Sequence, residues 1–445
     1  MRQIPLLKLN RLQQQYGPDF ILHSQQAYGD LFTAKVPFLP RIHFALHPNH
    51  AYELLVKQAH KLEKPALIRR TIQSSFGDGL FTSSGELWRK QRKLMQPAFH
   101  HGRIARYADR MVQHTTHLLN QWQAGQVIGL DEAMHALTFT IVVDALFSAD
   151  ASTQTAQISQ AMHDLGQGLS AQSLSFLAAM LPDWAPHPAL RQKQRGARGL
   201  KQAVTALIQE RRTLGEEASP PDLLSTLMFT RDAETGEPMR DSQVQDELVT
   251  LFIAGHETTA VLLAWAWVLL AQNPQVEARL QAELKEVLRG RVPTFADLPA
   301  LPYTGAIVKE VLRLYPPAWF IFRQAKEPVE LEGTTFPVDT LFFVFPYAVH
   351  RDARWYEQAH HFNPERWLTD LEQTLPKGAY FPFGLGPRIC IGNGFAQMEA
   401  QLLLATIAQR YHLDVLDKPE MIPGSPTLGF AHPVRVRLQA IEEVL

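Results

Sequence analysis

Apolar residues recur at three- and four-residue spacings over most of the chain between about residues 49 and 290. Stretches such as NHAYELLVKQ and LTFTIVVDALF carry this period, which is typical of α-helices. Alternating, β-branched or aromatic positions occur in shorter regions, near residues 30–47, 320–350 and 420–440. The pattern predicts a mainly α-helical protein with minor β structure.

The chain has neither an internal repeat nor a linker long enough to separate two domains. Three stretches rich in turn-forming residues, at 64–79, 181–190 and 214–222, are predicted to be loops. We therefore expect a single domain over residues 1–445, large enough to enclose an apolar cavity.

The longest predicted helix begins near Asp241 or Ser242 and ends near Gln272, where Asn273-Pro274 stops it. Ser242 and Gln245 have the S-x-x-Q spacing of a capping box. The helix would be roughly 46 Å long, enough to cross a whole domain.

The hexad AGHETT (254–259) interrupts the apolar sequence of this helix, and its apolar flanks predict that it is buried. In one interpretation the threonines bond to backbone carbonyls and Glu257 pairs with a distant base. In the other, the hexad distorts the helix locally and turns an acid and a hydroxyl toward a ligand. The hexad alone does not decide between them.

Composition and charge exclude several classes of protein. Lys and Arg total 43 against 44 for Asp and Glu, so charge gives no reason to expect a nucleic acid or an anionic membrane as partner. One cysteine excludes internal disulfides and tetrathiolate zinc sites. The N-terminal stretch lacks an apolar run of signal-peptide length, and the longest apolar run, AVLLAWAWVLLA, is too short for a bilayer. The expected location is the cytoplasm.

The single cysteine, Cys390, stands in the glycine-rich stretch FPFGLGPRICIG, directly before a predicted helix. A nucleophile would need a histidine base and a redox pair a second cysteine, while a buried inert thiol is a third possibility. Glycines leave room for a large flat group near the backbone. The helix N-terminus and Arg388 favour a thiolate. Together these features suggest the axial ligand of a haem.

The stretch FGLGPRICIG resembles the haem-binding signature F-x-x-G-x-R-x-C-x-G of the cytochrome P-450 superfamily. Its fixed positions are filled by Phe383, Gly386, Arg388, Cys390 and Gly392. The resemblance implies that Cys390 binds the haem iron.

Further motifs of this family occur in the family's order. AGHETT resembles its oxygen-activation motif, EVLR (310–313) its E-x-x-R helix and FNPERW (362–367) its P-E-R segment. Trp88 and Arg92 match its W-x-x-x-R pattern. The resemblance covers the chain from about residue 30 and is to the soluble bacterial type.

The resemblance implies the cytochrome P-450 fold, with haem b between the long central helix and the helix after the cysteine loop. Arginines and Trp88 are expected to bind the haem propionates. The haem-binding residues that the resemblance implies are Trp88, Arg92, Ala254, Arg323, Phe383, Arg388, Cys390 and Gly392.

Glu310 and Arg313 lie one helical turn apart and can pair on one face. By spacing alone this would equally suit an exposed ion pair, which contributes about 0–1 kcal/mol. The resemblance instead implies a buried network of Glu310, Arg313 and Arg366 that supports the haem loop.

The reaction implied is monooxygenation, in which one atom of O2 enters a C–H bond of the substrate and the other leaves as water. Glu257 and Thr258 would relay protons, whereas Thr259 is turned away by about 100° and is assigned to structure. Because the chain carries no flavin or iron–sulfur domain, a separate ferredoxin- or flavodoxin-type electron donor is expected. The segment WRKQRK (88–93) is either its docking patch or an ordinary solvated basic face.

The substrate is expected to be hydrophobic and lipid-like, a carotenoid or other terpenoid or a fatty acid. A non-catalytic haem sensor or carrier is the alternative function. We expect a monomer without a membrane anchor.

The triplet His350-Arg351-Asp352 resembles a kinase catalytic loop, but it is not accompanied by a phosphate-binding loop, so a kinase is rejected. The candidate pocket segments are 64–79, 165–190, 251–258, 318–322 and 428–430.

Overall fold

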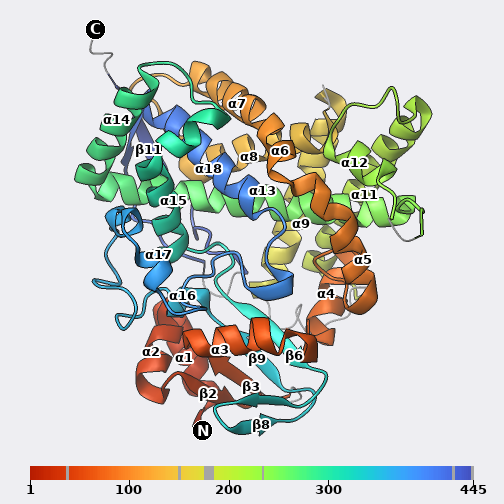
Figure 1. The fold of residues 1–445 in the computed structure, drawn as a ribbon, viewed down its shortest axis with the longest axis vertical. Helices are drawn as coiled ribbons and strands as arrows, with labels where there is room; N and C mark the ends of the chain where they lie inside the picture. The colour runs from red at the N-terminus through yellow and green to blue at the C-terminus, as the bar shows by residue number, and fades with distance from the viewer. Residues whose placement is uncertain (37–39, 149–151, 175–184, 233–234, 423–425, 442–445) are drawn as a thin grey trace. The chain divides into compact units, whose positions relative to one another are not determined.

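The computed structural model describes residues 1–36, 40–148, 152–174, 185–232, 235–422 and 426–441. The chain forms two compact units. Unit 1 consists of Met1–Glu63, Ala108–Leu137 and Thr258–Leu445, and unit 2 of Lys64–Tyr107 and Thr138–Glu257. Helices dominate the secondary structure (Figure 1), which confirms the predicted fold class.

The α-helices alternate with short 3-10 segments and loops. They are α1 (Leu6–Tyr16), α2 (Phe20–Tyr28), α3 (Pro48–Tyr52), α4 (Ala66–Phe76), α5 (Gly85–Met95), α6 (His101–Ile104), α7 (Ala108–Gln121), α8 (Leu130–Phe147), α9 (Ser152–Leu174), α11 (Pro188–Leu214), α12 (Leu223–Phe229), α13 (Asp241–Gln272), α14 (Pro274–Leu288), α15 (Pro302–Leu314), α16 (Pro346–Val349), α17 (Leu371–Thr374) and α18 (Asn393–Ala408).

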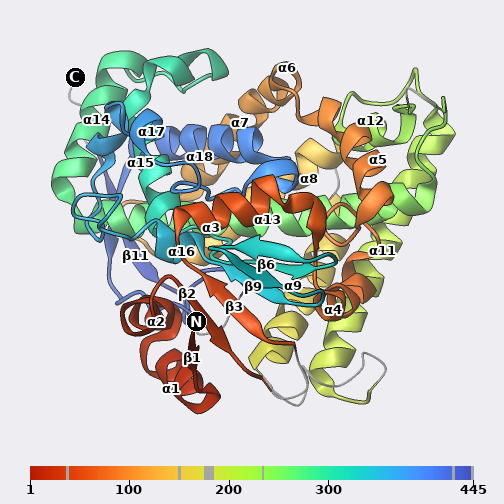
Figure 2. The same ribbon diagram turned by 60° about the horizontal axis from the view of Figure 1, so that its bottom comes forward.

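The main sheet lies in unit 1 and has the strand order β1-β2-β3-β9-β6-β4. Its register places Phe32 opposite Phe44, and Phe44 beside Phe343 of β9. The Phe32 and Phe44 rings stack with centroids 4.7 Å apart. Figures 1 and 2 both show α1 and α2 beside the β1–β2–β3 part of the sheet. The strands are β1 (Arg2–Ile4), β2 (Leu31–Ala34), β3 (Ile42–Ala45), β4 (Leu62–Glu63), β6 (Ile321–Ala325) and β9 (Leu341–Val344).

Two smaller β structures complete unit 1. One is a three-stranded sheet with the order β10-β11-β5, and the other is the hairpin β7–β8. All three predicted β-rich regions therefore contain strands. The bounds are β5 (Val127–Gly129), β7 (Val329–Leu331), β8 (Thr334–Phe336), β10 (Tyr411–Val415) and β11 (Arg435–Ala440).

Helix α18 is buried over most of its length, from Met398 to Ala408. A helix that is apolar on nearly all sides needs neighbours on all sides, and α18 packs against α7, α14 and α15. This packing gives the loop before α18 a rigid support.

Unit 2 contains closely packed helices. α11 lies along α9, and Gly196 allows the approach because a Cβ there would stand 2.3 Å from the Leu165 backbone nitrogen. Gly255 similarly lies against Val142 of α8.

Helix α13 spans Asp241–Gln272, as the sequence predicts. Among the helices that the structure describes, it is the one long and apolar enough to cross a membrane by length and composition, yet 67% of its apolar 18-residue stretch is buried. A buried core helix meets the same criterion.

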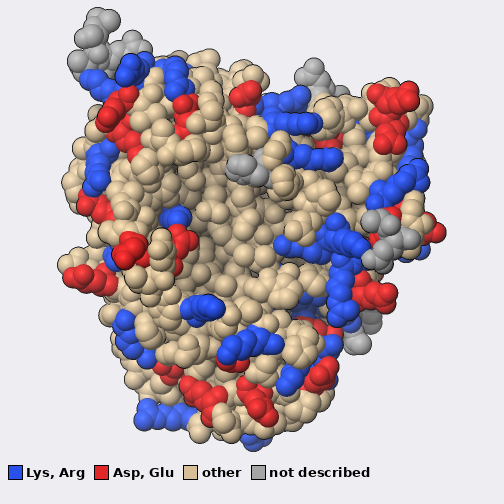
Figure 3. Space-filling view, in the orientation of Figure 1, with Lys and Arg blue, Asp and Glu red and all other residues tan. Residues whose placement is uncertain are grey.

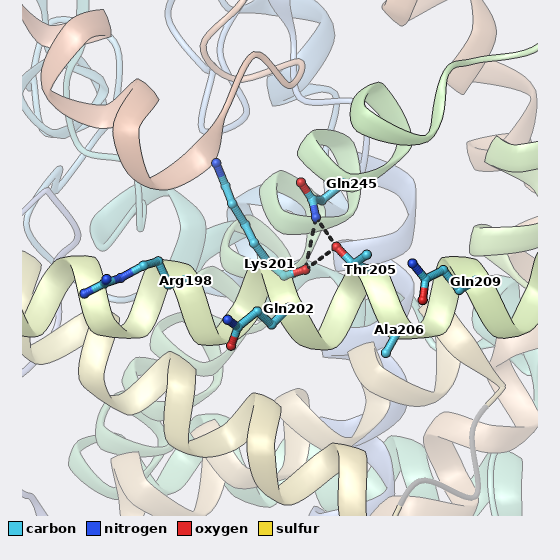
Figure 4. Close-up of a pocket in the computed structure, with 7 residues that line it drawn as sticks. All are labelled: Arg198, Lys201, Gln202, Thr205, Ala206, Gln209 and Gln245. Carbon is cyan, nitrogen blue, oxygen red and sulfur yellow. Dashed lines mark hydrogen bonds between the residues drawn. The ribbon is translucent and has the colours of Figure 1, made fainter.

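The predicted capping box of this helix is wrong. The helix already begins at Asp241, so Ser242 lies inside it. Gln245 donates from Nε2 to the Lys201 carbonyl at 3.0 Å and to the Thr205 hydroxyl (Figure 4). Its side chain thus joins α13 to α11 instead of capping α13.

The predicted loops have different outcomes. Residues 64–79 contain helix α4, whose apolar period outweighed the flanking proline and glycines, and Gly77 ends it with φ +66°. Residues 215–222 are non-helical, as predicted. Part of the 181–190 loop and of the 165–190 pocket segment lies outside the described residues.

Candidate functional site

The loop before α18 folds back on itself through backbone hydrogen bonds. The Cys390 N–H donates to the Phe383 carbonyl at 2.9 Å, and the Gly384 N–H donates to the Phe381 carbonyl at 3.0 Å. Gly386 has φ +68°, and a Cβ there would stand 2.0 Å from the Leu55 carbonyl oxygen. Glycine is therefore required at this position both for its backbone angle and for space.

Cys390 is an exposed cysteine two residues before Gly392, which caps the N-terminus of α18. The N-terminus of a helix carries a partial positive charge that stabilises a thiolate. Phe383 and Arg388 are partly buried in the same loop. The structure thus gathers the predicted residues of this signature around one accessible sulfur.

Arg323 on β6 and Arg388 in the loop are close enough to repel each other electrostatically. Desolvation lowers the pKa of Arg388 to about 10, with Arg323 adding to this effect and Glu63 opposing it. Desolvation also lowers the pKa of Arg323 to about 10. Two desolvated guanidinium groups favour binding of an anionic group, such as a carboxylate, next to them.

The predicted Glu310 network is present and buried. Arg313 donates to both carboxylate oxygens of Glu310 at 2.8 Å, and both side chains are fully buried. Arg366 also donates from Nε to the Glu310 carboxylate, at 3.1 Å. Sequence reasoning missed Trp367, whose Nε1 also donates to Glu310, at 2.8 Å. The tryptophan directly after Arg366 in FNPERW was the available signal.

Unit 2 holds Trp88 and Arg92 on α5 and Ala254 and Glu257 on α13, whereas Thr258 belongs to unit 1. Trp88 and Arg92 are partly buried and lie one turn apart on α5, so they share a face. Arg89, Lys90 and Lys93 are exposed. Figure 3 shows a group of Lys and Arg side chains in the region that α5 occupies in Figure 1.

The hexad on α13 is less buried than predicted. Ala254 is exposed, Glu257 and Thr258 are partly buried, and only Thr259 is fully buried. The apolar residues on either side of the hexad are packed. Within the described residues, the side of the hexad that carries Ala254, Glu257 and Thr258 is partly accessible. The helix is continuous here, so the hexad causes no break in it.

Thr259 has a buried acidic neighbour on α18. Desolvation raises the pKa of the Glu399 carboxyl to about 8, and a hydrogen bond with Thr259 partly opposes this shift. Thr259 is thus turned into the packed interior of unit 1, away from the accessible side of the hexad.

Several residues of the predicted substrate pocket belong to the core instead. Trp319 packs edge-on against Phe20 and Phe345, and Phe252 packs against Phe139. The groove drawn in Figure 4 is an open surface feature between side chains of α11 and Gln245 of α13. Its lining of glutamines and cations does not suit an apolar substrate.

Comparisons with known proteins place these features in context. The cytochrome P450 family model matches residues 4–438. Cyclooctat-9-en-7-ol 5-monooxygenase of Streptomyces melanosporofaciens is 37% identical over 88% of this chain and 84% of its own length. Pentalenene oxygenase of Streptomyces avermitilis is 33% identical over 95% of this chain and 92% of its own length.

Solved structures resemble the fold over its full length. The crystal structure of CYP175A1 from Thermus thermophilus has a TM-score of 0.78 and 26% identity, covering 99% of this chain and 100% of that one. Cyanobacterial CYP120A1 with bound retinoic acid has a TM-score of 0.85 and 24% identity, covering 99% of both chains. All of the candidate site residues described above lie inside residues 4–438.

Proposed function

The chain belongs to the cytochrome P450 family, and from that premise we propose that it hydroxylates a polycyclic terpenoid with electrons from a separate redox protein. The family assignment confirms the sequence resemblance. The protein is a monooxygenase with iron protoporphyrin IX as cofactor, and it uses O2, a substrate and a redox partner.

One observation carries the substrate proposal. Similar bacterial enzymes are named for the oxygenation of cyclooctat-9-en-7-ol and of pentalenene, at 37% and 33% identity over most of this chain. Both names denote polycyclic terpenoids, whereas the sequence-based expectation also included carotenoids and fatty acids. The names therefore support a cyclic terpenoid, rather than another lipid-like molecule, as the proposed substrate.

The residues of unit 1 fit a haem. Cys390 offers an accessible sulfur, and Arg323 with Arg388 offers two desolvated cations for propionates. When bound through a thiolate, haem supplies the chemistry that activates dioxygen. We assign Cys390 as the iron ligand because it is the only cysteine. Trp88, Arg92, Ala254, Phe383 and Gly392 remain predicted contacts.

Ligand titration of the purified ferric protein tests the substrate class. A polycyclic terpene hydrocarbon or its monohydroxylated form should shift the iron spin state and yield a hydroxylated product with a surrogate reductase. A carotenoid and a long-chain fatty acid serve as comparison ligands. Hydroxylation of the fatty acid alone would refute the terpenoid proposal, and ligand binding without any turnover would favour a sensor or carrier.

Glu257 and Thr258 are proposed to move protons. Thr258 is partly buried and adjacent to an acid on the accessible face of α13. Its Oγ1 would hold a water molecule that exchanges protons with Glu257. Thr258→Val should keep substrate binding, but product formation should fall by about 10²-fold or more, since a positioned proton donor contributes about 10²–10⁴-fold.

The measurement is product formed per NAD(P)H oxidised, with hydrogen peroxide assayed in the same vessel. Thr258→Ser keeps a hydroxyl and should restore much of the coupling. Thr259→Val is the control for a packed threonine of the same helix. If Thr258→Val couples as well as the wild type, Thr258 has no part in proton transfer.

The exposed cations of α5 are proposed to dock an acidic ferredoxin or flavodoxin. Replacing Arg89, Lys90 and Lys93 with glutamine should slow electron transfer at low salt and weaken its salt dependence, because such charges are screened with a Debye length of about 10 Å at 0.1 M. Stopped-flow reduction rates measure this. The matched control replaces Arg191, Arg195 and Arg198, which are exposed on α11. Equal effects of the two triple variants would point to net charge, not docking.

A further inference from the structure

His350 connects two parts of unit 1 that the motifs treat separately. The Phe381 N–H donates to His350 Nε2 at 2.9 Å. A backbone N–H can only donate, so Nε2 must be the unprotonated nitrogen of the imidazole. Nδ1 then carries the proton and donates it to the Arg313 carbonyl at 3.2 Å. Both ring nitrogens are thus used, and the tautomer is fixed.

The connection to Arg313 runs in both directions. Arg313 donates from Nη1 to the His350 carbonyl at 2.7 Å, while its other nitrogens bind Glu310. The His350 residue is fully buried. Burial, together with the nearby Arg313, holds the pKa of His350 well below its usual value, so the ring stays neutral. Nε2 therefore remains available to accept the hydrogen bond from the Phe381 N–H.

On its other side, His350 reaches the cysteine loop. The Phe381 N–H donates to His350, while the Phe381 carbonyl accepts from the Gly384 N–H. Two residues further on, the Phe383 carbonyl accepts from the Cys390 N–H. The His350 ring also contacts the rings of Tyr380 and Phe381, with centroids 5.3 Å apart in each case. A continuous series of hydrogen bonds and short backbone steps thus leads from Glu310 to Cys390.

We propose that His350 is a positioning residue that fixes the cysteine loop to the Glu310–Arg313 pair and holds the Cys390 sulfur in place to bind iron. This rests on Cys390 being the iron ligand, which a separate substitution tests below. A histidine that only fills space in the core would need neither a defined tautomer nor these two partners.

Two substitutions separate the roles of the two ring nitrogens. In His350→Gln the amide oxygen can occupy the position of Nε2 and accept from Phe381, whereas in His350→Asn it reaches only as far as Nδ1. The readout is the rate at which the thiolate-type Soret band of the reduced carbon monoxide complex converts to the non-thiolate band in mild urea. We expect a rate near wild type for His350→Gln and about tenfold faster conversion for His350→Asn, the effect of losing roughly 1.4 kcal/mol from one buried hydrogen bond.

His43 provides the control, because it is equally buried on β3 but packs against Phe336 and Phe342. His43→Asn should leave the conversion rate unchanged. Equal rates for His350→Gln and His350→Asn would overturn the proposal.

A second measurement needs no variant. In the haem-loaded wild type, the Phe381 amide should exchange its hydrogen as slowly as the core amides of α18. Fast exchange of this amide would also overturn the proposal. Neither result depends on the substrate. Absence of a thiolate-type band from the wild type before urea is added would instead refute Cys390 as ligand.

Discussion

Replacing Cys390 with histidine is expected to abolish the thiolate-type Soret band of the reduced carbon monoxide complex and to abolish hydroxylation. Cys390 is the only cysteine of the chain, so no other side chain can supply a thiolate. Histidine can still bind iron, but it donates less electron density to the metal than a thiolate does. The variant should therefore retain haem while losing the characteristic spectrum.

The spectrum of the purified Cys390→His protein, recorded at equal haem content to wild type, decides the point. Ile391→Val is the matched control, since it alters the neighbouring residue without touching the sulfur. Survival of the thiolate-type band in Cys390→His would mean that the iron ligand has been assigned wrongly.

Removing the Glu310 carboxylate is expected to have the largest effect on stability. Five hydrogen bonds, from Arg313, Asn363, Arg366 and Trp367, converge on its two oxygens. In Glu310→Ala the Arg313 guanidinium would remain buried without its counter-ion. Breaking a buried ion pair on one side costs about 3–5 kcal/mol, so the free energy of unfolding should fall by that amount and haem content should fall with it.

The same helix offers an internal comparison. Lys309 pairs with Glu372, and more than half of the Glu372 side chain is exposed to solvent. Glu372→Ala should therefore change the free energy of unfolding by about 0–1 kcal/mol only. Urea unfolding of the two variants measures both values. A Glu310→Ala protein as stable as Glu372→Ala would show that the buried network is not needed for folding.

Much of the fold follows from local patterns along the chain. The bounds of α13 agree with the predicted ones because an N-terminal polar segment and Asn273-Pro274 mark its ends. The strands β2 and β3 also fall where alternation predicts them. Helix α4 was missed because proline and glycine on either side suggested a loop.

What could not be predicted depends on contacts between distant residues. Gln245 reads as a capping residue, but its amide binds α11, some 40 residues away in sequence. The buried surroundings of Thr259 also depend on a distant residue, Glu399 of α18. The role proposed for His350 could not be predicted from neighbouring residues either, because its partners Arg313 and Phe381 lie far from it in the chain.

The strand order of the main sheet has a consequence for how the protein is made. β3 pairs with β9, so the hydrogen bonds between these two strands can form only after residues near 342 have been synthesised. Pairings between such distant segments are intrinsically slow, and a nascent chain exposes its N-terminal strands during synthesis. Haem uptake should therefore begin only after β9 and the cysteine loop have left the ribosome. Nascent chains stalled with residue 392 still inside the ribosome and with residue 392 fully outside it would show this, and haem binding by the shorter chain would contradict it.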